Sequence, residues 1–376
     1  MSISRYICTL SFVLVLISSA DAQVVAGQPP RLDVRSLARP PLPSDPLELV
    51  TGGAQPIQDA DQRGAVTQLL TTAHSLSNVR AQPYDMKTSF ASHGGSASDG
   101  TWTLQDTSPG RNVYRWTAQG PNYSGVNLYT DSRYYVSDPA AAIPLRLAQV
   151  RETIFFTTAP MGPYAGLRTA AGYLNGTAVQ CVLVAFGGPL PAVSSGRDWQ
   201  EAEYCVDPKT GLLMTYSPVP GLYVRYDYSQ AIQFHGHTIP GSFIITQGGK
   251  TIIEAKTESV ADPPAGSSPQ FQPGSLRMAG VGSVMTPASR MFSMSYPPSP
   301  LTNNVRVDMV VLHSVTSASS ETNELEVLLS TDPSANQRAL DTVAKRPMPM
   351  GAGTQPGATP QSHEAFFTFE VLSAAN

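Results

Sequence analysis

Gly221-Leu-Tyr-Val-Arg-Tyr-Asp-Tyr-Ser229 is the stretch that most clearly decides the fold class of this chain. Apolar and aromatic residues at positions 222, 224, 226 and 228 alternate with Arg225 and Asp227. This alternation is typical of a strand with one buried face. Two further strands are predicted over residues 239–247 and 251–260, joined by Gly248-Gly249 as a tight hairpin turn. The pattern therefore predicts antiparallel strands that follow one another directly.

The same period of two recurs earlier in the chain, in segments separated by turn residues. These predicted strands occupy residues 84–90, 102–104, 114–116, 126–128, 177–186 and 201–206. Residues 58–78 and 144–155 have helical spacing instead, and Pro144 takes the first helical position of the second segment. About nine strands at hairpin distance predict one long, strongly curved antiparallel sheet wrapped over a helix.

The composition agrees with short strands joined by turns. Of 376 residues, 30 are Gly, 33 are Pro and only 14% are charged, whereas roughly 25% are charged in ordinary soluble domains. These values argue against a coiled coil or a helical bundle. The net charge of −4 provides no basic surface, so nucleic acid is not an expected partner.

Residues 1–22 have the pattern of a secretory signal peptide. Arg5 precedes an apolar stretch at residues 7–17, and Ala20-Asp21-Ala22 forms a cleavage site of the A-x-A type. We therefore expect an exported protein whose mature chain begins near Gln23. No later segment reaches 18 consecutive apolar residues, so no membrane-spanning helix is expected in the mature chain.

Two cysteines remain after the predicted cleavage, Cys181 and Cys205. An even number of cysteines in an exported chain favours a disulfide, and both lie in segments predicted to be neighbouring strands. The alternative is a pair of buried free thiols, because disulfide geometry depends on a strand register that the sequence does not fix.

Composition also divides the chain into units. After the signal peptide, residues 23–46 form a Pro-rich extended segment, and residues 263–275 read as a Pro/Gly/Ser linker. We therefore predict a first domain over residues 47–262 and a second domain over residues 276–376.

Several segments of the first domain carry a family resemblance. After the opening helix they are Gly100-Thr-Trp-Thr-Leu104, Asn112-Val-Tyr-Arg-Trp116, Val126-Asn-Leu-Tyr129, Cys205-Val-Asp-Pro-Lys-Thr-Gly-Leu-Leu213 and the closing strands. Together they resemble the periplasmic outer-membrane lipoprotein carriers (LolA-like proteins) and their lipid-binding relatives. The resemblance implies a mainly β fold with α, in which a curved antiparallel incomplete β-barrel is covered by helices. It also implies a bacterial periplasmic or outer-envelope protein with a concave apolar surface for an acyl chain or a lipoprotein.

The second domain carries a different resemblance. Tyr296-Pro297-Pro298 precedes predicted strands at 305–312 and 325–329, a helix over 333–345 and a final strand at 365–372. Asp332 caps this helix and Pro333 takes its first position. The order resembles the TonB C-terminal domain and implies a small ββαβ α+β module that docks to another envelope protein. Arg346-Pro347-Met348 departs from the family's aromatic pair after the helix, so energy coupling stays open.

Few residues suggest catalysis. His235 and His237 would lie on one face of a strand, a geometry that suits a metal. The favoured interpretation is that they are residues at a strand boundary without a metal. Glu201 and Glu203 also share a strand face, and side chains in this relation usually form a solvated polar surface. No nucleophile elbow, phosphate-binding loop or zinc-protease helix is present. We therefore expect neither an enzyme nor a cofactor, with a hydrolase using His235 or His237 as the remaining catalytic alternative.

Side chains on the predicted strands are candidates for lining a hydrophobic cavity, since rings with a polar group suit amphiphiles. The candidates are Tyr114, Trp116, Val126, Leu128, Tyr204, Leu222, Val224, Tyr226 and Tyr228. They are equally what an antiparallel sheet places in its own core. Two functions therefore stay open. In one, a hydrophobic molecule, acyl chain or lipoprotein occupies the sheet; in the other, its own side chains fill it and the C-terminal module binds outer-membrane transport components.

Overall fold

A computed structural model describes residues 37, 39–43, 53–94, 98–110, 112–155, 165–185, 196–281, 290–296, 305–316, 323–345 and 363–374. The predicted signal peptide and most of the Pro-rich segment lie outside these residues. Within them, no helix combines the length and the apolar character that crossing a membrane requires.

The described chain is mainly β, as predicted. The large sheet consists of β1 (Gln55–Pro56), β2 (Tyr84–Ser92), β3 (Gly100–Gly110), β4 (Val113–Gly120), β5 (Tyr123–Thr130), β6 (Arg133–Val136), β7 (Gly166–Leu174), β8 (Thr177–Ala185), β9 (Glu201–Val206), β10 (Leu213–Val219), β11 (Leu222–Asp227), β14 (Ser242–Gln247), β15 (Lys250–Ala261) and β16 (Arg277–Val281). The remaining elements are the hairpin strands β12 (Ile232–Phe234) and β13 (His237–Ile239), the C-terminal strands β17 (Arg290–Tyr296), β18 (Val305–Thr316), β19 (Asn323–Ser330) and β20 (His363–Ala374), and the helices α1 (Ala60–Ser77), α2 (Leu145–Ile154), η2 (Ser268–Phe271) and α3 (Pro333–Ala344).

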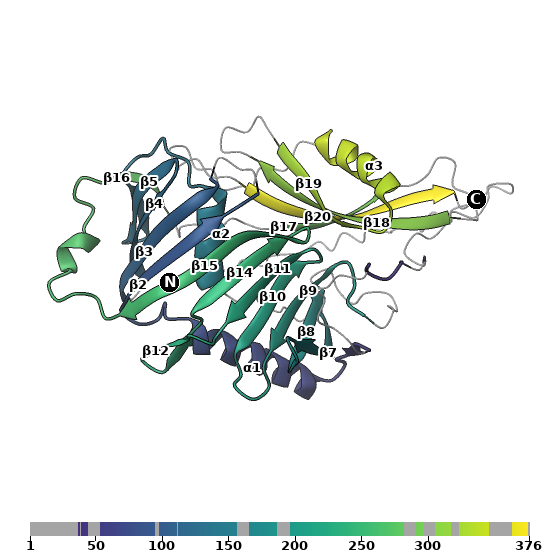
Figure 1. Cartoon of the computed structure of the whole chain (residues 1–376), viewed down its shortest axis with the longest axis horizontal. Helices are drawn as coiled ribbons and strands as arrows, with labels where there is room; N and C mark the ends of the chain where they lie inside the picture. The colour runs from purple at the N-terminus through teal and green to yellow at the C-terminus, as the bar shows by residue number, and fades with distance from the viewer. Residues whose placement is uncertain are drawn as a thin grey trace, which may run out of the picture.

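The large sheet is antiparallel and open. Its strand order is β1-β7-β8-β9-β10-β11-β14-β15-β2-β3-β4-β5-β6-β16, and Figure 1 shows it curving around the molecule. Most neighbours in the sheet are also neighbours in the chain. The main exception is β2, which pairs with β15 and so joins the two halves of the sheet. This arrangement confirms the predicted large antiparallel sheet that does not close into a barrel.

Local sequence explains the strands and turns at the centre of the sheet. The alternation in β11 buries Leu222, Val224 and Tyr226 on one face, as predicted. Gly248 and Gly249 form the two-residue turn between β14 and β15, both with positive φ, 55° and 77°. Glycine adopts these angles without steric cost, which fixes the hairpin register.

Two helices lie on one face of the large sheet. The Asp59 side chain caps α1 by accepting a hydrogen bond from the backbone N–H of Gln62. Apolar residues of α1 and α2 belong to the same buried cluster as the centre of the sheet. Pro144 stands at the N-cap of α2 rather than at its first position. Because proline has no N–H to satisfy, either place at a helix start suits it.

The C-terminal strands form a second sheet, in the order β17-β20-β18-β19. β20 is antiparallel to β18 and parallel to β17. The strands and helix predicted within residues 305–372 are present, and Asp332 caps α3 as expected. α3 packs on one face of this sheet through Ala335, Ala339 and Val343.

The region around the predicted linker belongs to the large sheet. η2 forms within residues 263–275, and its Gln270 backbone oxygen accepts a hydrogen bond from Arg115 Nη1, 3.0 Å away on β4. Residues 277–281, assigned from the sequence to the second domain, form β16 and pair with β6. The second sheet therefore begins later than the predicted boundary at residue 276.

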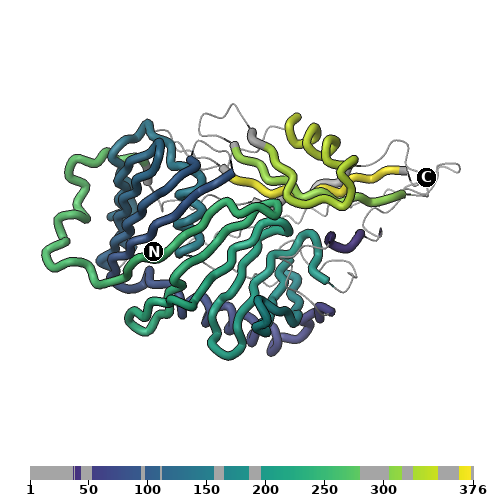
Figure 2. The backbone as a smooth tube through the Cα atoms, in the orientation of Figure 1, coloured from purple at the N-terminus to yellow at the C-terminus, as the bar shows by residue number. Residues whose placement is uncertain are grey.

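The two sheets share a core. The face of the C-terminal sheet opposite α3 contributes Met309, Val311 and Phe366 to the cluster that contains Leu222 and Val224 of β11. Figure 2 shows this sheet lying across one end of the central strands of the large sheet. The turn after β10 fits closely beneath it, because a Cβ built on Gly221 would lie 2.8 Å from Leu328 Cβ. The C-terminal sheet thus covers part of the inner face of the large sheet.

The predicted disulfide is present. Cys181 on β8 and Cys205 on β9 are directly opposed in the antiparallel pairing and are bonded to each other. Both are completely buried beside Leu174 and Val179, on the face opposite the shared core.

We expect the double substitution Cys181→Ser and Cys205→Ser to lower the free energy of unfolding by about 3 kcal/mol, because the unfolded chain loses a cross-link that closes a loop of this length. Urea unfolding of the oxidised protein and the double variant measures the difference. Dithiothreitol should weaken only the parent protein. A loss below about 1 kcal/mol would contradict a stabilising role for the bridge.

Candidate functional site

A pocket opens where the large sheet, α2 and the C-terminal sheet meet. It has a volume of about 450 Å³, including the solvent at its mouth. Its lining residues come from α2, β10, β11, β14 and β20: Gln149, Glu152, Thr153, Tyr216, Pro218, Leu222, Val224, Ile245, Glu364 and Phe366. No Lys, Arg or His is among these described lining residues.

The elements divide the pocket lining into an apolar and a polar part. Leu222, Val224 and Ile245 project from neighbouring strands because β11 pairs directly with β14, with Val224 opposite Ile245. The spacing of three and four residues on α2 places Gln149, Glu152 and Thr153 on one helical face, toward these strands. The pocket therefore has hydrocarbon walls and a polar group of α2 side chains.

A buried chain of hydrogen bonds supports the polar part from behind. Glu364 Oε1 accepts from Gln149 Nε2 at 2.8 Å and lies 2.6 Å from His313 Nε2. His313 Nδ1 lies 3.0 Å from Gln247 Nε2, whose amide also donates to Glu326. The amide nitrogen is a donor, so Nδ1 is the acceptor and Nε2 carries the proton shared with Glu364. Strand β14, the C-terminal sheet and α2 are thereby linked at one point.

Glu152 is a lining residue whose ionisation is strongly perturbed. Burial, and after it the negative charge of Glu364, raises the pKa of Glu152 to about 8. Glu152 forms no hydrogen bond or ion pair with any residue that the structure describes. The pocket thus contains a carboxyl group that is largely neutral at pH 7.

Only part of the predicted lining set reaches the pocket. Leu222 and Val224 line it, and Tyr226 lies beside it with its hydroxyl donating to the Thr153 carbonyl oxygen at 3.2 Å. Tyr204 is buried behind Tyr216, with ring centroids 5.0 Å apart. The Tyr228 hydroxyl donates to the Leu213 carbonyl oxygen at the other end of the strands.

Tyr114 and Trp116 contact a buried arginine of α2. The guanidinium carbon of Arg151 lies 4.8 Å from the Trp116 ring and 5.6 Å from the Tyr114 ring. The same guanidinium forms two hydrogen bonds to Asp106 Oδ2, at 3.0 and 2.7 Å. These aromatic rings therefore hold a paired cation within the core, and neither lines the pocket.

Val126 and Leu128, two of the candidate lining residues, do not lie on the same face of the sheet as Trp116. Trp116 lies opposite Asn127 in the β4–β5 pairing, so residues 126 and 128 project to the other face. Leu128 is fully buried there, on the side where η2 packs against β4. A difference of one residue in register reverses the face to which every side chain of a strand points.

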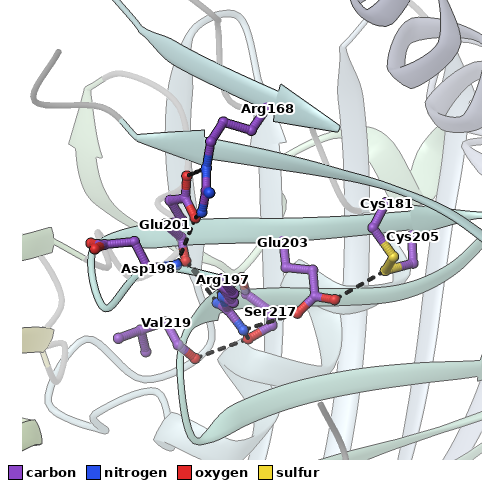
Figure 3. A network of polar contacts seen from close by, with 9 residues as sticks. All are labelled: Arg168, Cys181, Arg197, Asp198, Glu201, Glu203, Cys205, Ser217 and Val219. Atoms are coloured by element: carbon purple, nitrogen blue, oxygen red, sulfur yellow. Dashed lines mark hydrogen bonds and ion pairs between the residues drawn. A yellow bond between two sulfur atoms is a disulfide. The ribbon is translucent and has the colours of Figure 1, made fainter. Parts of the chain in front are cut away.

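The prediction that Glu201 and Glu203 form a solvated polar surface is wrong. Both carboxylates are buried on the face opposite the shared core, and Figure 3 shows them within a network of polar contacts. Arg168 forms a bidentate pair with Glu201 at 2.7 and 2.5 Å. Arg197 Nη1 lies 3.1 Å from Glu203 Oε2, and both of these side chains are completely buried. These glutamates are structural partners of arginines and are not exposed to a substrate.

His235 and His237 do not form a shared site. His235 has a φ of 46° and, with Gly236, forms the two-residue turn between β12 and β13. Its Nε2 lies 2.9 Å from Asp262, whereas His237 Nδ1 lies 2.8 Å from the Ser75 carbonyl oxygen. Because residue 235 is in the turn, the predicted common strand face does not exist. Within the described ranges, the one group with metal-ligand geometry is Cys181, Glu203 and Cys205, and its cysteines are joined in the disulfide.

Sequence reasoning missed Glu152, Tyr216, Glu364 and Phe366. Glu152 lies on a helix that was predicted from the spacing of other residues, and the two β20 residues reach the pocket through contact between sequence-distant sheets. An acidic residue next to the apolar positions of α2 was the available signal for Glu152.

Comparison with known proteins identifies no family. No family model matches the chain, and no curated protein matches it. Among solved structures, a LolA superfamily protein from Nitrosomonas europaea is similar at a TM-score of 0.36 and 10% identity, covering 54% of this chain and 95% of that one. A DUF1329 family protein from Desulfovibrio piger is similar at a TM-score of 0.36 and 10% identity, covering 56% and 99%. Values this low assign neither a fold family nor a function to the chain.

Proposed function

We propose that this chain is a non-enzymatic, exported protein of the bacterial periplasm or outer envelope that binds a hydrophobic molecule on the inner face of its large sheet. The observation that carries the proposal is the pocket between β10, β11, β14, α2 and β20. Its walls are mainly apolar and one side carries polar side chains of α2, an arrangement that is typical of small-molecule sites. An acyl chain is the ligand class that this combination suits.

The C-terminal sheet serves in this proposal as a cover for the site. Phe366 and Glu364 of β20 form one side of the pocket, so the ligand lies between the two sheets. The TonB-like character of the module and its docking to another envelope protein belong to the same proposal.

A second function is supported by a separate observation. Met309, Val311 and Phe366 already fill part of the inner face with the chain's own side chains. In this alternative the sheet is a closed scaffold, and the C-terminal module alone carries the function by binding outer-membrane transport components.

Filling the pocket discriminates between these two functions. We expect Val224→Trp to weaken binding of the neutral fluorescent probe N-phenyl-1-naphthylamine at least tenfold, because the indole occupies space that the probe needs. Fluorescence titration of parent and variant measures this loss. Tyr173→Trp is the matched control, since Tyr173 is 58% exposed on β7 and the introduced indole lies outside the pocket. Equal probe binding by the parent and Val224→Trp would contradict a ligand site here.

A further inference from the structure

We propose that the pocket selects amphiphiles with a cationic head group, and that the Glu152 carboxyl is the group that recognises the cation. This inference rests on the proposed function, since it assigns the head group of the molecule whose chain the apolar walls hold. It adds a charge preference that the shape of the sheet alone does not supply.

Two carboxyl groups lie beside the apolar walls of the pocket. Glu152 and Glu364 reach the pocket from opposite elements, α2 and β20, and the apolar walls Leu222, Val224 and Ile245 belong to the sheet beside them. An amphiphile whose chain follows these walls therefore has its head group next to the two carboxyl groups.

The two carboxyl groups differ in their hydrogen-bond partners. Glu364 Oε1 already accepts from Gln149, which also lines the pocket, and from His313 behind it, so Glu364 is held in place. Glu152 is half-buried and has no partner among the described residues. Partial loss of water disfavours its charged form, and a ligand of opposite charge stabilises that form.

The charges of the lining residues favour a positively charged ligand. The described lining residues include two acidic side chains and no basic one. A fatty-acid carboxylate would place a third acidic group beside Glu152 and Glu364 in a poorly solvated space. An ammonium group would attract both carboxylates and relieve their mutual repulsion.

The ionisation of Glu152 determines how the affinity for a cation depends on pH. The titratable groups facing Glu152 are Glu364 on β20, Tyr216 on β10 and Tyr226 on β11, with His313 of β18 behind Glu364. Burial raises the pKa of both tyrosines, so they stay neutral up to pH 9. Because the pKa of Glu152 is about 8, its carboxylate forms between pH 7 and pH 9. Affinity for a cation must rise over this interval, since the cation binds the deprotonated form.

Titration with dodecyltrimethylammonium, whose charge does not change with pH, tests the inference. Displacement of N-phenyl-1-naphthylamine is measured at pH 7 and pH 9, below the critical micelle concentration of the cation. We expect about tenfold tighter binding at pH 9, and dodecanoate should bind at least tenfold more weakly than the cation at that pH. Glu152→Gln should remove the pH dependence, whereas the exposed control Glu258→Gln should retain it.

The outcomes separate the two proposals. If the neutral probe binds but dodecanoate competes as well as dodecyltrimethylammonium, or if Glu152→Gln keeps the pH dependence, the head-group inference is overturned and the hydrophobic site stands. If the neutral probe itself does not bind, both proposals fail.

Discussion

Arg197→Met is expected to destabilise the protein by about 3–5 kcal/mol, because it leaves the buried Glu203 carboxylate without its cation. Arg197 also donates to the carbonyl oxygens of Glu201 and Ser217, at 2.8 and 3.1 Å, and to the Ser217 hydroxyl at 2.9 Å. One side chain therefore satisfies acceptors on both β9 and β10. Urea unfolding followed by tryptophan fluorescence measures the loss.

Two further variants show whether the charge is responsible. Adding Glu203→Met to Arg197→Met should recover at least half of the lost stability, since no unpaired charge then remains buried. Lys256→Met removes a lysine that pairs with Glu258 at the surface, and should destabilise the protein much less than Arg197→Met. A loss for Arg197→Met as small as that for Lys256→Met would contradict the buried pair.

Phe366→Ala is expected to destabilise the protein by about 3–5 kcal/mol, the range for removing a large aromatic ring from a core. The Phe366 side chain is 1% exposed, stacks on His313 with centroids 5.1 Å apart and lines the pocket. Because Phe366 belongs to the core that the two sheets share, the loss should appear as a shift of one cooperative transition.

Circular dichroism and tryptophan fluorescence together check this second prediction. Two of the three tryptophans, Trp102 and Trp116, lie on strands of the large sheet, and Trp199 lies just before β9, so fluorescence reports mainly on the large sheet. Both signals should shift equally in Phe366→Ala. Met278→Ala, at a side chain that is 57% exposed, should shift neither. A fluorescence midpoint unchanged by Phe366→Ala would mean that the two sheets unfold independently.

Features set by local sequence could be predicted. The period of two in β11, the Gly248-Gly249 turn and the Asp332 cap depend on residues that are close in the chain, and all three are present. The disulfide was also predictable, because the two cysteines fall in strands that are consecutive in the chain.

Features that depend on distant contacts could not be predicted. Glu203 is hidden from solvent by Arg197, which lies in the segment before β9 and not on a strand. The error at Leu128 followed from the pairing register of β4 and β5, which the alternation pattern leaves free by one residue. The largest omission was the cover that β20 forms over the large sheet, since two separate apolar patterns do not reveal that their faces meet.

The central claim is that the space between the two sheets holds a hydrophobic molecule. Native mass spectrometry of the protein purified from the cells that naturally produce it, followed by organic extraction of what co-purifies, tests this claim most directly. We predict one amphiphile per chain in the parent protein, released on denaturation and absent from Val224→Trp. An unliganded mass for the parent protein would contradict the claim and favour the closed-scaffold alternative.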